Sequence, residues 1–173
     1  MQIAIVTVSD RASRGQYEDL SGPAIEDWLK EVITSPYQTV NRIIPDGMIS
    51  VRDELIRLCD EDQVDLILTT GGTGPAPRDE TPEAMREVLV KELPGFGEQL
   101  RRASLKQTPT AILSRQTAGT RGKTLIINLP GKPSSIRFSL DTIFAAVPYC
   151  LDLIGAGRIE TDPARIRAFR PAS

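Results

Sequence analysis

The chain has 173 residues, of which 40% are hydrophobic and 25% charged, and its formal net charge is -2 at pH 7. This length and composition are typical of one globular domain with a sizeable hydrophobic core. Proteins that bind nucleic acid usually carry a basic surface, so the charge argues against nucleic acid as a partner.

The sequence contains no histidine, which excludes Ser-His-Asp and Cys-His catalysis and any zinc site that uses histidine. A bound metal would need oxygen ligands, and these favour Mg²⁺ or a similar hard cation. The two cysteines, Cys59 and Cys150, lie on apolar helical patterns. We therefore expect both to be reduced packing residues.

The first six residues lack both a basic segment and a long apolar segment, so they do not resemble a signal peptide. No apolar stretch reaches the length that spans a bilayer. We therefore expect a cytoplasmic protein without a membrane partner.

The first third of the chain predicts two strands around one helix. Residues 3–8 and 40–44 are apolar and rich in β-branched residues, which favours buried strands. Between them, a polar loop leads to Gly22-Pro23, where the apolar periodicity of a helix begins. Ser21 at this helix start is explained equally well as a capping residue or as part of a polar site with Asp19.

The middle of the chain predicts two further helices with a strand between them. Ser50 and Asp53 fit a capping pattern at the start of the first helix, and residues 66–68 form a short buried strand. Thr81-Pro82 then predicts a helix with Thr81 as its cap and proline at its first position.

The last third predicts a helix, a β-hairpin and a final helix. Apolar residues in 96–103 indicate a helix, and residues 118–123 form a turn between two extended segments. The second segment, 125–129, is apolar and precedes a helical pattern over 136–147. Residues 157–173 have little apolar periodicity, and we expect a surface tail.

This alternation of strands and helices predicts a three-layer α/β/α fold with a mostly parallel central sheet plus a small β-hairpin. Residues 1–156 form a single α/β domain in this interpretation, and residues 157–173 form a C-terminal tail.

Four polar loops directly follow predicted strands. They are Ser9-Asp10, Pro45-Asp46-Gly47, the glycine loop Gly71–Gly74, and Pro130-Gly131. The carboxyl ends of parallel strands lie on one edge of a sheet, and ligands of open α/β sheets bind there. The sequence therefore predicts that these loops meet around one ligand site.

The glycine loop can turn several backbone N–H groups toward an anion. The helix after it would add its positive dipole end, and the hydroxyls of Thr70 and Thr73 can donate to phosphate oxygens. The loop lacks the Gly-Lys-Ser/Thr ending of a Walker A motif, and it is not a dinucleotide-binding fingerprint. A tight structural turn is the alternative explanation.

Asp46 and Asp79 are the candidate catalytic and metal-binding carboxylates. Either or both can hold Mg²⁺ against the phosphates of a nucleotide. The alternative roles are a β-turn residue for Asp46 and a charge near a helix N-terminus for Asp79. Basic residues in the edge loops can offset phosphate charge, although plain solvation explains each of them; they are Arg11, Arg14, Lys123 and Lys132.

The ordered motifs resemble the molybdopterin adenylyltransferases. The resemblance covers residues 3 to about 155, and any one motif alone is weak. The motifs are Val8-Ser9-Asp10, Asp19-Leu20-Ser21-Gly22-Pro23, Pro45-Asp46, Thr69–Gly74, Pro77-Arg78-Asp79, Thr81–Ala84, Ala118-Gly119 and Asn128–Pro133.

This resemblance implies an enzyme that joins AMP from ATP to the terminal phosphate of molybdopterin, releases pyrophosphate and requires Mg²⁺. It implies a homotrimer and a handover of product to a molybdopterin molybdotransferase. Asp46 and Asp79 match family aspartates implicated in catalysis. The pocket-lining positions implied for substrate binding are Ser9, Asp19, Ser21, Gly22, Thr70, Gly71, Gly72, Thr73, Gly74, Pro130 and Gly131.

Two other functions remain open from the sequence. The domain also occurs in molybdopterin molybdotransferases, which insert the metal but are much longer chains. A pterin-binding carrier or scaffold without turnover is the second alternative. The sequence does not indicate molybdenum or tungsten as the final metal, and it does not indicate the nucleotide base preference.

Overall fold

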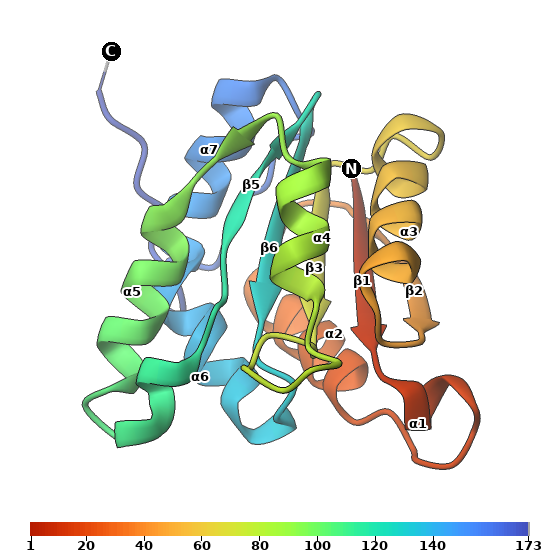
Figure 1. Ribbon diagram of the computed structural model, residues 1–173. Helices are drawn as coiled ribbons and strands as arrows, with labels where there is room; N and C mark the ends of the chain where they lie inside the picture. The colour runs from red at the N-terminus through yellow and green to blue at the C-terminus, as the bar shows by residue number, and fades with distance from the viewer. Residues whose placement is uncertain (173) are drawn as a thin grey trace.

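Six strands form one sheet in the order β2-β1-β3-β6-β5-β4 (Figure 1). The first four strands in this order are mutually parallel, and β5 and β4 pair antiparallel at one side. The predicted parallel sheet and the hairpin formed by β5 and β6 are therefore confirmed. The strands are β1 (Gln2–Val8), β2 (Gln38–Ile44), β3 (Leu66–Thr70), β4 (Lys91–Glu92), β5 (Ala118–Arg121) and β6 (Thr124–Leu129).

Helices cover both faces of the sheet in this computed structural model, which describes residues 1–172 (Figure 1). One face packs against α2 (Ser21–Val32), α5 (Pro94–Ser104), α6 (Pro133–Ile143) and α7 (Val147–Ile154), and the other against α3 (Met48–Asp60) and α4 (Thr81–Val88). The short helices are α1 (Asp10–Ser13), η1 (Pro109–Leu113) and η2 (Phe144–Ala146).

The central strands are apolar on both faces because each face is covered. In β1, Ile3 and Ile5 belong to the core under α2 and α6, whereas Ala4 and Val6 belong to the core under α3 and α4. All four side chains are at most 1% exposed. This two-sided burial explains why β1 reads as a continuous apolar run rather than an alternating one.

The chain order of the strands creates a switch point between β1 and β3. From β1 the chain moves to β2 on one side, then returns to β3 on the other side. Loops that leave neighbouring strands in opposite directions open a crevice at the carboxyl edge, and ligands of open α/β sheets bind in such crevices.

Two predicted helix starts are wrong, and in both cases a tertiary contact replaces the expected cap. Ser50 lies inside α3 and its Oγ donates to the carbonyl of Pro45, while Glu80 accepts from the N–H of Met48 at the helix start. Thr81 is the first residue of α4 rather than its cap, and its Oγ1 donates to the carbonyl of Gly71.

Two connections also differ from the sequence-based expectation. The loop after β1 contains the short helix α1. In the hairpin, residues 118–121 already belong to β5, so the turn is confined to Gly122 and Lys123, with Gly122 at φ 55°.

The C-terminal segment packs more closely than the expected surface tail. Ile159 is fully buried and Ile166 is 7% exposed, both within the core under α2 and α6. Thr161 pairs with Ile33 in an isolated antiparallel bridge, and the N–H of Phe169 donates to the carbonyl of Ala145. These contacts tie the segment to the domain.

Both cysteines are free, as expected, and act as packing residues. Burial raises the pKa of the Cys59 thiol to about 11, and burial also raises the pKa of Cys150. Across residues 1–172, the helices are too short or too polar to cross a membrane.

We expect the Leu68→Ala substitution to lower the free energy of unfolding by about 2–5 kcal/mol, because Leu68 is fully buried in β3. The matched control is Leu153→Ala on α7, where the side chain is 67% exposed and the expected change is within about 0.5 kcal/mol. Urea denaturation monitored by circular dichroism measures both. Equal midpoints for the two variants would contradict this account of the core.

Candidate functional site

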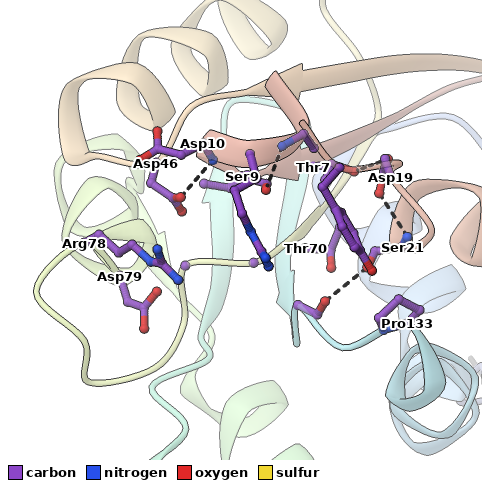
Figure 2. Close-up of a pocket in the computed structure, with 17 residues that line it drawn as sticks. Thr7, Ser9, Asp10, Asp19, Ser21, Asp46, Thr70, Arg78, Asp79 and Pro133 are labelled. Carbon is purple, nitrogen blue, oxygen red and sulfur yellow. Dashed lines mark hydrogen bonds between the residues drawn. The ribbon is translucent and has the colours of Figure 1, made fainter. Parts of the chain in front are cut away.

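A cavity of about 220 Å³ lies at the carboxyl edge of the sheet, where β1 and β3 diverge (Figure 2). The loops after β1, β2, β3 and β6 all contribute to its wall, as the sequence predicts for parallel strands. The predicted site residues that line it are Ser9, Asp19, Ser21, Asp46, Thr70, Gly71, Gly72, Asp79 and Gly131.

The other predicted positions lie beside this first cavity. Thr73, Gly74 and Pro130 line a second cavity of about 430 Å³, on the other side of the glycine loop. Gly22 lies behind Asp19, and a Cβ at Gly22 would meet Asp19 Oδ2 at 2.5 Å. The glycine loop is therefore a wall shared by two cavities, whereas the sequence predicts one pocket.

The turn at Gly71 and Gly72 requires glycine for structural reasons. Their φ angles are 103° and 63°, in the region that L side chains rarely adopt. A Cβ at Gly71 would lie 2.3 Å from the carbonyl oxygen of Val8, and one at Gly72 would lie 2.3 Å from Thr81 Oγ1. The tight-turn explanation therefore holds, and it is compatible with anion binding.

Three backbone N–H groups of the loop are available to a ligand. The N–H groups of Gly72, Thr73 and Gly74 find no acceptor within the described residues 1–172. Such consecutive N–H groups form an anion-binding concavity. α4 begins a few residues later with Thr81, so its positive dipole end lies on the same side of the sheet.

The hydroxyls of Thr70 and Ser21 have structural acceptors. Thr70 Oγ1 donates to the carbonyl of Pro130 over 2.7 Å, and Ser21 Oγ donates to the carbonyl of Gly131 over 3.1 Å. Both bonds hold the loop after β6 against the cavity. The expectation that Ser21 caps α2 is therefore wrong, whereas a phosphate contact of Thr70 stays a prediction.

Asp19 provides the cap that the sequence assigned to Ser21. Its Oδ1 accepts from the N–H groups of Ser21 and Gly22 at 2.9 and 3.1 Å, and its Oδ2 accepts from Thr7 Oγ1 at 2.7 Å. Because both oxygens are engaged, Asp19 holds the start of α2 on β1 and has little capacity left for a ligand.

Unlike Asp19, Asp46 and Asp79 each accept a hydrogen bond on only one carboxylate oxygen. Asp46 Oδ2 accepts from the N–H of Asp10 at 2.9 Å, and Asp79 Oδ2 accepts from the N–H of Ala76 at 3.2 Å. Within residues 1–172, Oδ1 of each has no hydrogen-bond donor. Figure 2 shows both carboxylates at one end of the cavity, with Arg78 between them and Asp19 at the other end.

The charge of the cavity lining is acidic. Four aspartates, Asp10, Asp19, Asp46 and Asp79, face two arginines, Arg11 and Arg78. A polyphosphate in this cavity would meet an excess of negative charge unless a cation accompanied it.

No cluster of three metal-ligating side chains occurs in the part of the chain that the structure describes. The two available oxygens of Asp46 and Asp79 nevertheless fit the usual mode of Mg²⁺ binding. Mg²⁺ typically takes one or two carboxylates, several waters and substrate phosphates rather than a complete protein cage.

Some residues that line the first cavity carry no signal in the sequence. Thr7 belongs to β1, and its inward direction is visible only once the sheet register is known. Tyr17 lines the first cavity with its ring 5.1 Å from the guanidinium carbon of Arg11, and no local pattern singled it out.

The candidate basic residues separate into different regions. Arg11 lines the first cavity and Lys132 the second. Arg14 instead pairs with Asp10 at 3.8 Å, and Lys123 lies at the hairpin turn, in a cavity beside Asp65 that precedes β3. Lys123 is therefore at the opposite edge of the sheet from the site.

Comparison with known proteins gives full-length matches. The chain is 54% identical over 171 residues to a molybdopterin adenylyltransferase of Helicobacter pylori, covering 99% of this chain and 97% of that protein. It is 46% identical over 185 residues to a molybdopterin adenylyltransferase of Escherichia coli, covering 100% of this chain and 95% of that protein.

A solved structure agrees with these sequence matches. The molybdopterin biosynthesis enzyme MoaB of Thermus thermophilus superposes with a TM-score of 0.83 at 41% identity, covering 92% of this chain and 99% of that one. Residues 4–149 match the family model described as a probable molybdopterin binding domain. The chain therefore belongs to this family of molybdenum cofactor biosynthesis proteins.

Proposed function

We propose that the protein is a molybdopterin adenylyltransferase that transfers AMP from ATP to the terminal phosphate of molybdopterin and releases pyrophosphate. The observation that carries this proposal is the glycine loop, which lines two cavities and whose Gly72, Thr73 and Gly74 N–H groups have no acceptor within residues 1–172. A reaction between two phosphorylated substrates needs two subsites that meet at the reacting phosphates. The near full-length similarity to molybdopterin adenylyltransferases supports the same reaction.

The first cavity suits the ATP phosphates, because it contains both available carboxylates. Asp46 and Asp79 line the first cavity and are absent from the lining of the second, within the described residues. The Mg²⁺ that accompanies ATP would be held by these two residues and by the phosphates. When bound, it offsets phosphate charge and the charge that develops on the leaving pyrophosphate.

The second cavity suits molybdopterin. It is the larger of the two at about 430 Å³, and its lining joins Phe138 to serine and glutamine side chains such as Ser135 and Gln116. A flat, polar heterocycle needs this combination of an aromatic contact and hydrogen-bonding groups. Lys132 at the mouth adds a positive charge for the phosphate.

In this arrangement a terminal phosphate oxygen of molybdopterin attacks the α-phosphorus of ATP. The bond from the α-phosphorus to the bridging oxygen breaks, and pyrophosphate leaves with that oxygen and its electron pair. The N–H groups of Gly72, Thr73 and Gly74 donate to phosphate oxygens and reduce the repulsion between the two anions. Alignment of the two phosphates across one rigid loop supplies much of the remaining rate.

The direct test mixes the protein with Mg²⁺, ATP and molybdopterin, then measures pyrophosphate and adenylylated pterin. Product that disappears with EDTA and returns with added Mg²⁺ supports the whole proposal. Tight pterin binding without pyrophosphate would favour the carrier or scaffold. To test the molybdotransferase-like alternative, adenylylated molybdopterin and molybdate replace ATP and molybdopterin, and release of AMP with metal insertion would favour that function.

We further propose a homotrimer in the cytoplasm that passes its product to a molybdopterin molybdotransferase. Family membership supports the assembly and the handover, and the use of ATP fits a cytoplasmic location. Sedimentation equilibrium tests the assembly, since a trimer contains three chains of 18.9 kDa.

We expect the Asp79→Asn variant to fold normally and bind molybdopterin but to lose turnover by roughly 100-fold or more. The substitution keeps the shape of the side chain and removes the charge beside the proposed metal position. Steady-state pyrophosphate release measures turnover, and a pterin-binding titration checks the second cavity. Asp27→Asn is the control, because Asp27 is 72% exposed on α2 and is absent from the lining of both cavities. Turnover near the wild-type value would remove Asp79 from the mechanism.

We expect the Phe138→Ala variant to raise the KM for molybdopterin about tenfold and to leave the KM for ATP unchanged, because a stacked ring contributes about 1–3 kcal/mol. The matched control is Phe169→Ala, whose side chain is 69% exposed on the C-terminal segment. Initial rates at varied concentrations of each substrate separate the two constants. A rise in the KM for ATP alone would reverse the assignment of the cavities.

A further inference from the structure

Arg115 connects the glycine loop to the segment that enters β5. Its own N–H donates to the carbonyl of Thr73 at 2.9 Å, and its Nε donates to the carbonyl of Gly74 at 2.9 Å. Its Nη2 donates to the carbonyl of Asp79, and its Nη1 pairs with the carboxylate of Glu83. One residue therefore holds three carbonyls of the loop and one side chain of α4.

The part of the loop that these contacts bracket has little other support. Residues 75–78 are exposed, and they lie between the two carbonyls that the guanidinium binds. The remaining bonds of this stretch are local, such as Asp79 N–H to the carbonyl of Ala76 at 2.9 Å. Thr81 ties the far end of the loop to Gly71 and Gly72 through its Oγ1 and its N–H, and Arg115 joins the Asp79 carbonyl to that of Gly74.

The geometry of the guanidinium matters as much as its charge. Its planar fork uses three separate nitrogens for the Gly74 carbonyl, the Asp79 carbonyl and the Glu83 carboxylate, whereas an ammonium donates from one nitrogen. Partial burial raises the pKa of Glu83, but the hydrogen bond and charge of Arg115 outweigh it and hold that pKa below its ordinary value. Glu83 thus remains ionised and fixes the orientation of the fork.

Arg115 lies behind the site rather than in it. It is absent from the lining of the first and the second cavity, whereas its neighbours Ser114 and Gln116 line the second cavity. Substrates in either cavity would therefore touch the loop and not the guanidinium.

We infer that Arg115 is a positioning residue for adenylyl transfer, which holds the glycine loop so that its N–H groups and the Asp79 carboxylate face the reacting phosphates. This inference rests on the proposed function for its catalytic part. The part that concerns loop geometry stands on the hydrogen bonds alone.

The substitution that tests it is Arg115→Lys, which keeps the charge and removes the fork. Arg121→Lys is a matched control, because Arg121 also binds a carboxylate, Asp60, and a carbonyl of α4, that of Val88, at the end far from the site. We expect kcat to fall roughly 10- to 100-fold in Arg115→Lys, with less than a threefold change in either KM, and to stay unchanged in Arg121→Lys.

A double-mutant cycle shows whether Arg115 acts through Asp79. If it does, Arg115→Lys in the Asp79→Asn background lowers kcat by less than threefold further, because the carboxylate that it positions is gone. Fully multiplicative effects, or equal losses of kcat in Arg115→Lys and Arg121→Lys, would overturn the inference.

Hydrogen exchange gives a readout that does not depend on activity. We expect the amides of Ala76 and of residues 78–81 to exchange at least about tenfold faster in Arg115→Lys than in the wild type, and not in Arg121→Lys. Unchanged exchange would overturn the positioning role even in an active enzyme. If the wild-type protein makes no adenylylated pterin, the proposed function fails while this measurement still decides the role of Arg115 in the loop.

Discussion

The site depends on one constraint: the backbone of the turn after β3 passes very close to the backbone at the end of β1. A Cβ at Gly71 would lie 2.3 Å from the Val8 carbonyl, so only glycine lets the turn pass there. β1 and β3 are parallel neighbours, and their loops leave on opposite sides of the switch point. The turn therefore closes one side of the first cavity with backbone rather than side chains, which leaves N–H groups to face a ligand.

The aspartates of the first cavity differ in how many carboxylate oxygens they leave free for a ligand, because their hydrogen bonds differ. Asp19 uses both oxygens to fix Thr7 and the start of α2, so its charge is spread over structural donors. Asp46 and Asp79 each use one oxygen to shape a loop and keep the other free within residues 1–172. The same residues thus hold the cavity open and give it the acidic character that a polyphosphate tolerates only with a cation.

Predictions from the sequence succeed here where they follow from periodicity and fail where they depend on distant partners. The parallel sheet and the shared edge follow from apolar strands such as β1 and from loops placed directly after them. The capping roles of Thr81 and Ser21 are wrong because each hydroxyl donates to a carbonyl of another loop, and that of Ser50 is wrong because α3 already begins at Met48. Arg115 carries no local signal, since the Asp79 carbonyl that it binds is 36 residues away.

The division into two cavities explains why a single loop has to be both exposed and rigid. In the proposed reaction the N–H groups of Gly72, Thr73 and Gly74 donate to phosphates, and the residues that follow them, 75–78, are exposed. Rigidity must then come from behind the loop, where Arg115 binds three of its carbonyls. Because Ser114 and Gln116 flank Arg115 and line the second cavity, a shift of this segment moves both walls together. In the proposed reaction, the distance between the ATP and molybdopterin subsites would therefore depend on one short piece of chain, and alignment of this kind needs no catalytic histidine.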